Sequence, residues 1–302
     1  MNRNDERQLR DYLADRKAQI DAALDALIPG EANDPPAIFQ AARYSLLAGG
    51  KRLRPILCLA AAEAVGADNG TVMPVACALE CIHAYSLIHD DLPAMDNDDY
   101  RRGRLTSHKV FGEDIAILAG DALLTEAFHL LTRRELMPGI PPEQLLDVAA
   151  EIAAAAGWSG MVGGQVLDVR SDGKTVDLEA LEQIHRLKTG ALIRVSLRAG
   201  AILGGASPDM LASLSEYGRQ IGLAFQIADD ILNVEGDRAL LGKQTGSDAA
   251  RGKATFPALM GIASSRARAE ALIAGALVSL DPFDDRAEPL RRIARYILER
   301  KS

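Results

Sequence analysis

Apolar residues recur at helical spacing along nearly every segment of the chain, and Gly and Pro separate these segments. The segments are rich in Ala, Leu, Glu and Arg, which favour helix, and alternating patterns typical of strands are almost absent. The pattern therefore predicts an all-α protein. The predicted helices span residues 5–27, 36–48, 55–65, 72–92, 113–135, 142–156, 177–203, 208–234, 255–280 and 286–300.

Local signals account for several of the predicted helix ends. We expect Pro29 and Gly30 to end the first helix, Gly49 and Gly50 to end the second, and Pro55 to open the third, where a missing N–H costs nothing. The glycine-rich stretch 157–165 is too short for a linker and is followed by apolar positions. We therefore predict a single helical domain that covers residues 1–302.

Two predicted segments, 72–88 and 221–234, are apolar on almost every side. A helix of this kind is buried by its neighbours. We expect both segments at the centre of the domain, where apolar helices wall a central cavity.

The net charge narrows the choice of ligand. The chain has 302 residues, with 34 Lys and Arg against 42 Asp and Glu, for a formal charge of −8. An acidic chain is a poor partner for nucleic acid or an anionic membrane, so we expect neither nucleic-acid binding nor stable membrane association. An anionic ligand would have to meet local basic clusters or metal ions.

The cysteines and the N-terminal segment indicate the cellular compartment in which we expect the protein. Three cysteines without Cys-x-x-Cys spacing indicate buried small side chains in a reducing environment. The charged N-terminal segment does not resemble a signal peptide, and we find no run of about eighteen apolar residues. We therefore expect a cytoplasmic protein.

The segment HDDLPAMDNDDYRRGR, residues 89–104, is the richest in candidate chemistry. Carboxylates this close repel one another unless water or cations relieve the repulsion. A solvated acidic loop would explain an isolated cluster, but this one ends an apolar helix and is followed at once by three arginines. The aspartates are Asp90, Asp91, Asp96, Asp98 and Asp99, and the arginines are Arg101, Arg102 and Arg104.

A second acidic pair, Asp229 and Asp230, ends another apolar helix in FQIADDILN. Asp229 and Asn233 are four residues apart and share a helix face. Mg²⁺ binds through one or two carboxylates and leaves its other positions to water and phosphate oxygens. Two open aspartate clusters therefore predict a shared Mg²⁺ site for a diphosphate.

The spacing of the first cluster also predicts a break in its helix. Asp90 and Asp96 are six residues apart, which rotates them by about 240° in a regular helix and points them away from each other. Pro93 lies between them and disfavours a regular turn.

A third motif, GGKRLRP, spans residues 49–55 on a predicted glycine turn between two helices. Backbone N–H groups and basic side chains can approach an anion together at such a turn. Its basic residues are Lys51, Arg52 and Arg54.

These motifs, in this order, resemble the trans-acting isoprenyl diphosphate synthases, specifically the bacterial short-chain type to which farnesyl diphosphate synthases belong. The resemblance rests on GGKRLRP, DDLPAMD with its trailing RRG, the triplet 188–190, FQIADDILN and the later LGK and GKATFP segments. It covers nearly the whole chain. It implies the isoprenoid synthase fold, a homodimer, and head-to-tail condensation of isopentenyl diphosphate with an allylic diphosphate.

The resemblance also implies roles for individual residues. Up to three Mg²⁺ ions would be held from two walls by Asp90, Asp91, Asp96, Asp229 and Asp230. The allylic diphosphate would be bound by Arg101, Lys188, Lys243 and Lys253. Isopentenyl diphosphate would be bound by Lys51, Arg54, His83 and Arg102. The catalytic residues would be Lys188, Thr189 and Gln226, the last two turning oxygens toward the allylic carbon.

Product length is expected to depend on what lies beneath the first aspartate cluster. Tyr85 and Ser86 precede Asp90 by about one helical turn, with Tyr85 about 7.5 Å away along the axis. A tyrosine there would form the floor of the tunnel for the growing chain, which favours a C15 product, farnesyl diphosphate. Geranyl and geranylgeranyl diphosphate synthases remain alternatives. Asn233 replaces the usual third carboxylate of the second motif, and we expect it to lie outside the metal's direct ligands.

Two other functions are compatible with parts of the sequence. The pairs Glu80–His83, Glu126–His129 and Glu182–His185 have the Glu-x-x-His spacing of di-iron helix bundles, but this leaves GGKRLRP and both aspartate pairs unexplained. A non-catalytic subunit of a heteromeric prenyltransferase would keep the fold and lose an aspartate motif. Here the first motif is intact and the second nearly so.

Overall fold

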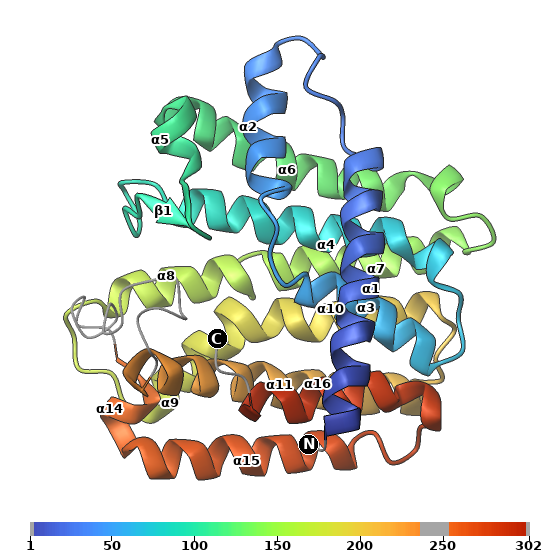
Figure 1. The fold of residues 1–302 in the computed structure, drawn as a ribbon, viewed down its shortest axis with the longest axis vertical. Coiled ribbons are helices and arrows are strands. Elements are labelled where there is room, and N and C mark those ends of the chain that lie inside the picture. The colour runs from blue at the N-terminus through green and yellow to red at the C-terminus, as the bar shows by residue number, and fades with distance from the viewer. Residues whose placement is uncertain (1–2, 236–253, 300–302) are drawn as a thin grey trace.

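The computed structural model describes residues 3–235 and 254–299, and within these ranges the chain is almost wholly helical (Figure 1). The helices of the first half are α1 (Arg3–Leu27), α2 (Pro36–Leu46), α3 (Leu53–Ala64), α4 (Asn69–Asp90), α5 (Ser107–Phe111) and α6 (Glu113–Thr132). They are followed by α7 (Pro142–Ala156), α8 (Met161–Ser171), α9 (Leu178–His185), α10 (Ala191–Leu203), α11 (Pro208–Glu235), α14 (Phe256–Met260), α15 (Ile262–Val278) and α16 (Glu288–Glu299). The prediction of an all-α protein is confirmed.

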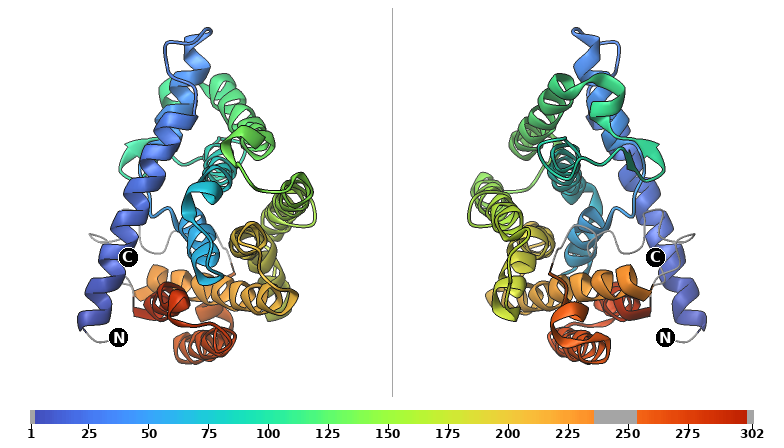
Figure 2. Two further views of the ribbon diagram at one scale, coloured as in Figure 1. Left: turned by 90° about the vertical axis from the view of Figure 1, so that its right-hand side faces the viewer. Right: turned by 90° about the vertical axis from the view of Figure 1, so that its left-hand side faces the viewer.

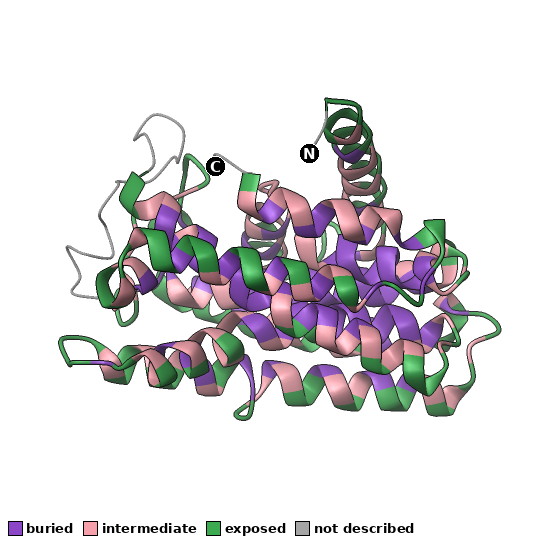
Figure 3. Cartoon of the chain, turned by 90° about the horizontal axis from the view of Figure 1, so that it is seen from below, coloured by how far each residue is buried: buried purple, intermediate pink, exposed green. Residues whose placement is uncertain are grey.

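Helices α3, α4, α10 and α11 occupy the centre, where α3 packs between α4 and α10, and α10 packs on α11. On the outside, α6 covers α4 and α15 covers α11, while α1 runs along one side of the domain (Figures 1 and 2). Buried residues gather on these central helices (Figure 3). A side chain at Gly200 of α10 would overlap the Cys58 carbonyl oxygen of α3, so glycine there permits a close approach of the two backbones. The prediction that segments 72–88 and 221–234 lie at the centre of the domain is confirmed.

The break predicted at Pro93 is also confirmed. Helix α4 ends at Asp90, and a series of turns follows it. The Asp96 amide folds back to donate to the Asp90 carbonyl oxygen at 2.8 Å. Residues 90 and 96 are therefore brought together by a loop and not along a helix.

Several element boundaries differ from the sequence prediction. The single helix predicted over 177–203 is instead α9, a π-helical turn η2 (Arg186–Gly190) and α10, and Gly261, with φ +80°, separates α14 from α15. The glycine-rich stretch leads into α8, which was not predicted. A short hairpin of β1 (Tyr100–Arg101) and β2 (Arg104–Leu105) follows the first aspartate cluster. The described residues also form two 3₁₀ turns, η1 (Arg134–Leu136) and η3 (Asp285–Ala287).

The three cysteines are buried and form no disulfide, as expected. The expectation about long apolar runs was wrong. Asn69–Asp90, Glu113–Thr132 and Pro142–Ser171 are long and apolar enough to cross a membrane, judged by length and composition alone. The apolar window of the first is 72% buried inside the protein, whereas the other two are 39% and 33% buried, so they keep apolar surface exposed.

Candidate active site

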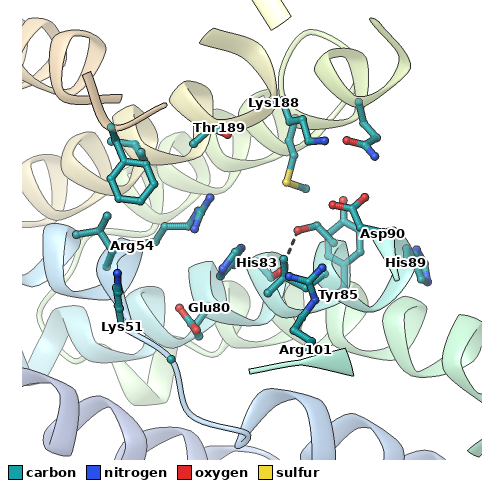
Figure 4. Close-up of a pocket in the computed structure, with 18 of the residues that line it drawn as sticks. Lys51, Arg54, Glu80, His83, Tyr85, His89, Asp90, Arg101, Lys188 and Thr189 are labelled. Atoms are coloured by element: carbon teal, nitrogen blue, oxygen red, sulfur yellow. Dashed lines mark hydrogen bonds between the residues drawn. The ribbon is translucent and has the colours of Figure 1, made fainter. Parts of the chain in front are cut away.

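A cavity of about 840 Å³ lies between α4, α8, the η2 turn, α11 and the loop before α3 (Figure 4). In Figure 4, Lys188 and Thr189 lie on one wall, His83, Tyr85 and Asp90 lie on the facing wall, and Lys51 and Arg54 lie at the end away from Asp90. The site residues predicted from the sequence that line it are Lys51, Arg54, His83, Tyr85, Ser86, Asp90, Arg101, Arg102, Lys188, Thr189, Gln226 and Asp229.

Three of the predicted metal ligands, Asp91, Asp96 and Asp230, do not line this cavity. Asp91 binds Arg101 with both carboxylate oxygens, and Asp230 accepts the Phe256 backbone N–H at 2.9 Å. The metal roles of these three aspartates therefore stay predictions. Lys243 and Lys253 lie outside the described residues.

Arg52 fixes the basic loop before α3 through buried hydrogen bonds. This residue has a left-handed backbone with φ 51° and is only 2% exposed. Its guanidinium donates to Asp21 of α1 at 2.8 Å, to Glu80 of α4 at 2.7 Å and to the Leu46 carbonyl at 2.8 Å. Arg52 thus makes its hydrogen bonds within the protein, whereas the side chains of its neighbours Lys51 and Arg54 line the cavity.

Arg54 and His83 form a desolvated basic end of the cavity. Burial lowers the pKa of Arg54 to about 10, with Glu80 opposing this change and Arg102 adding to it. Burial also lowers the pKa of His83 well below its ordinary value, and the positive charges of Arg54 and Arg102 add to the shift. His83 is therefore neutral near pH 7. Within the described residues, Arg54 Nε and His83 Nδ1 are buried without a hydrogen-bond partner, as an anion site would require.

The other end of the cavity concentrates negative charge at Asp90. Burial raises the pKa of Asp90 to about 6; Lys188 opposes this rise, and the nearby carboxylate of Asp96 adds to it. A divalent cation would relieve this repulsion, so the carboxylates at this end fit Mg²⁺. Among the described residues, no three His, Cys, Asp or Glu side chains form a complete metal site.

Lys188 is held in the cavity wall by α8, which sequence reasoning missed. Its ammonium donates to Asp168 at 2.6 Å, and the π-helical turn carries both Lys188 and Thr189 to the cavity. A side chain at Gly164 would overlap the Lys188 backbone, so this glycine lets α8 lie directly against the turn. Gln165, three residues before Asp168 on the same helix face, also lines the cavity, and this spacing could have revealed both residues.

A fixed aromatic ring, that of Tyr85, lines the cavity beside Asp90 (Figure 4). Its side chain is 7% exposed and meets the His89 ring edge-on, with the ring centroids 5.7 Å apart. His89 in turn fits against Gly120 of α6, where any side chain would overlap the imidazole. The Tyr85 ring is therefore supported by a second layer of packing.

The glutamate–histidine pairs that favoured a di-iron protein are used elsewhere. Glu80 binds Arg52, and Glu182 binds Arg268 of α15. Glu126 is hydrogen-bonded to His129 on the same helix, α6, at 3.1 Å. The three pairs thus take part in three separate contacts, which gives no support to a shared di-iron centre.

Comparisons with known proteins agree with this fold. The sequence pattern of polyprenyl synthetase matches residues 35–279. The chain is 50% identical over 293 residues to a dimethylallyltranstransferase of Fischerella ambigua, covering 97% of this chain and 84% of that protein. It is 49% identical over 255 residues to a farnesyl diphosphate synthase of Geobacillus stearothermophilus, covering 84% and 85%.

Among solved structures, an FPP/GFPP synthase of Zymomonas mobilis superimposes with a TM-score of 0.86 at 40% identity, covering 96% of this chain and 99% of that one. The geranylgeranyl pyrophosphate synthetase of Pyrococcus horikoshii gives 0.88 at 33% identity, covering 97% and 99%. The helical fold is thus that of a prenyltransferase. The chain belongs to the polyprenyl synthetase family.

Proposed function

We propose that this prenyltransferase joins isopentenyl diphosphate head-to-tail to an allylic diphosphate, with farnesyl diphosphate as its main product. The observation that carries the proposal is the distribution of charge in one apolar cavity. Lys51 and Arg54 line one part of it, where the Arg102 guanidinium lies against Gly50, and Asp90 and Lys188 line another. Two separate anionic groups can therefore be bound with their hydrocarbon parts facing each other.

The chemistry follows from this separation. When the C–O bond of the allylic diphosphate breaks, the electron pair leaves with the diphosphate and a carbocation remains. Mg²⁺, when bound, neutralises charge on the leaving diphosphate. Lys188 and Arg101 donate to the same group, and positioned donors of this kind stabilise charge as it develops. Apolar walls of α8 and α11 exclude water that would convert the cation to an alcohol.

The second substrate supplies the new bond. Its double bond attacks the cation to form a C–C bond, and a proton leaves from the neighbouring carbon. Arg54 and neutral His83 hold its diphosphate by hydrogen bonds. No side chain is assigned as the base, and the resemblance to the synthases favours the released diphosphate as the proton acceptor.

A C15 product is supported by Tyr85, which lines the cavity beside Asp90 and whose ring is held by the packing of His89 against Gly120. Relatives alone do not separate the possible products. They include the farnesyl diphosphate synthase named above, a geranylgeranyl diphosphate synthase of Cyanophora paradoxa that is 45% identical, and a geranylfarnesyl diphosphate synthase of Leucosceptrum canum that is 46% identical. A geranylgeranyl product is the second candidate.

The proposed activity is tested by incubating the protein with Mg²⁺, isopentenyl diphosphate and either dimethylallyl or geranyl diphosphate. We expect C15 as the main product from both starters, and loss of activity after chelation with EDTA. The absence of condensation with either starter would refute the proposed function.

Replacing Tyr85 by alanine is expected to lengthen the product. Removal of the ring opens space directly below Asp90, so a chain of C20 or longer can be accommodated. The measurement is chromatography of products formed with excess isopentenyl diphosphate. Tyr100→Ala is the control, because that tyrosine is exposed and does not line the cavity. An unchanged C15 product in Tyr85→Ala would show that another residue limits the chain.

We also propose a homodimer, as the resemblance implies. Helix α6 exposes Ile117 and Leu118, at 45% and 52%, which is consistent with a subunit contact on that helix. Light scattering is expected to give twice the chain mass of 32.3 kDa. A mass of one chain at micromolar concentration would contradict this.

A further inference from the structure

The hairpin that carries Arg101 and Arg102 is largely exposed, so its position depends on specific contacts more than on apolar burial. Residues 102–105 are all exposed to solvent. On the first strand, Arg101 is bound to Asp91 beside the end of α4. The tip turns through two residues with left-handed backbones, Arg102 with φ 54° and Gly103 with φ 75°. The tip and the second strand make their contacts with the basic loop and with α2.

Tyr44 of α2 contacts the second strand through both its hydroxyl and its ring. The hydroxyl donates to the Leu105 backbone carbonyl oxygen at 2.9 Å. The Arg104 guanidinium lies over the ring face, 4.1 Å from the centroid, in a cation–π contact. The Phe111 ring meets the Tyr44 ring nearly edge-on, with the centroids 5.4 Å apart. Tyr44 thus fixes β2 to α2.

Arg102 joins the tip of the hairpin to the basic loop. Its Nη1 donates to the Gly49 carbonyl oxygen. A Cβ atom at Gly50 would lie 2.6 Å from the guanidinium carbon of Arg102, so the guanidinium occupies the place that a side chain would take. Gly50 also has φ +124°, a conformation that glycine adopts without steric cost. Glycine at this position therefore leaves the space in which Arg102 lies.

The two contacts with the hairpin lie close together in the sequence. Tyr44 and Gly49 are five residues apart, and the first contacts Leu105 whereas the second contacts Arg102. The segment that leads from α2 into the basic loop is thus bound to the hairpin at both of its ends. The loop and the hairpin therefore form one unit at the cavity.

We infer that Tyr44 and Gly50 are positioning residues for Arg102, which they hold at the basic end of the cavity to bind the diphosphate of isopentenyl diphosphate. Lys51 follows Gly50 directly and lines the same cavity, so the hairpin adds a cation to those that the loop supplies. The ligand in this inference rests on the proposed function. The attachment of the hairpin to α2 and to the loop does not depend on any ligand.

Limited digestion with trypsin tests the attachment without substrate, because trypsin cleaves after arginine and the exposed hairpin contains Arg102 and Arg104. In Tyr44→Leu we expect cleavage in the hairpin, measured by mass spectrometry of the fragments, to be about tenfold faster than in the parent. Circular dichroism checks that the variant folds. Unchanged cleavage would refute the attachment, whether or not the protein catalyses condensation.

Tyr12→Leu is the matched control for this digestion. Tyr12 also donates its hydroxyl, to Glu63 at 2.8 Å, and it also has an arginine over its ring, Arg16 at 5.0 Å. These contacts join α1 to α3, so we expect cleavage in the hairpin to stay within about twofold of the parent. Equally fast cleavage in both variants would show a general loosening of the protein and would overturn the role of Tyr44.

Calorimetric binding of each substrate alone tests the role of Tyr44 in recognition. Tyr44→Phe removes only the hydroxyl, and we expect the affinity for isopentenyl diphosphate to fall by about fivefold. The affinity for geranyl diphosphate is expected to stay within about twofold, because Arg101 remains bound to Asp91. Equal losses for the two substrates would overturn the inference.

A double-mutant cycle shows whether Tyr44 acts through Arg102. We expect Tyr44→Phe/Arg102→Gln to bind isopentenyl diphosphate as weakly as Arg102→Gln alone. Additive losses would contradict a role through Arg102. Parent-like binding by Arg102→Gln would overturn the assignment of the ligand, whereas the proposed function is tested separately by condensation in the parent protein.

Gly50→Ala is compared in the parent and in Arg102→Gln, because strain in the backbone is then common to both. In the parent we expect the affinity for isopentenyl diphosphate to fall by about tenfold, since the new methyl group displaces the guanidinium. In Arg102→Gln we expect the same substitution to cost less than about threefold. Equal losses in the two backgrounds would refute the role of Gly50.

Discussion

Asp90→Asn is expected to lower kcat/KM for condensation by about a thousandfold. Asp90 is half-buried beside the cavity among other carboxylates, and its charge is what a cation at that end would meet. Loss of a cation's stabilisation of the leaving diphosphate amounts to several kcal/mol, and about 4 kcal/mol corresponds to three factors of ten. Steady-state kinetics with geranyl and isopentenyl diphosphate at saturating Mg²⁺ measure the loss.

The matched control for this experiment is Asp99→Asn. Asp99 belongs to the same acidic segment but pairs with Lys109 at 2.8 Å on the surface and does not line the cavity. We expect its rate to stay within about threefold of the parent, because exposed ion pairs contribute little. If Asp90→Asn and Asp99→Asn lose activity equally, the loss results from the changed overall charge of the segment and not from the position of Asp90 at the cavity.

Arg52→Met is expected to lower the free energy of unfolding by about 3–5 kcal/mol. The substitution leaves Glu80, which is 2% exposed, without its cation and removes the contacts to Asp21 and the Leu46 carbonyl. An unpaired buried charge is costly because the protein interior solvates it poorly. Urea denaturation followed by circular dichroism measures the change.

Two further variants identify the cause of that loss. Arg52→Met/Glu80→Gln removes both charges and is expected to regain part of the stability. Arg219→Met breaks the exposed pair with Glu216 and is expected to cost less than about 1 kcal/mol. If Arg52→Met were no more destabilising than Arg219→Met, the buried network would not be what holds the basic loop.

The features that the sequence predicted correctly depend on local patterns. Helical periodicity identified the all-α fold, and the six-residue spacing of Asp90 and Asp96 required the break that occurs at Pro93. The charged residues of GGKRLRP and of the first aspartate cluster were found because they interrupt apolar helices. Asp90 and Asp229 do line one cavity, as the hypothesis of a site shared by the two aspartate clusters requires.

The features that were missed depend on contacts between distant segments. The π-helical turn at Lys188 lies where α8 packs against its backbone at Gly164, and neither position has a distinctive local pattern. Arg52 has the same charge as its neighbours in the sequence, and only the buried Glu80 of α4 distinguishes its role. The directions of Asp91 and Asp230 likewise depend on Arg101 and Phe256, which lie 10 and 26 residues away.

Helix α4 carries Asp90, the proposed metal ligand, and the ring of Tyr85 on one rigid element, five residues apart. Evolution can therefore alter the space below Asp90 by exchanging one side chain, without moving the helix or disturbing the charged contacts at its end. Under the proposed role of Tyr85, product size and catalytic chemistry can change separately. This modularity is consistent with relatives that share nearly half of this sequence yet bear the names of synthases for products of different length.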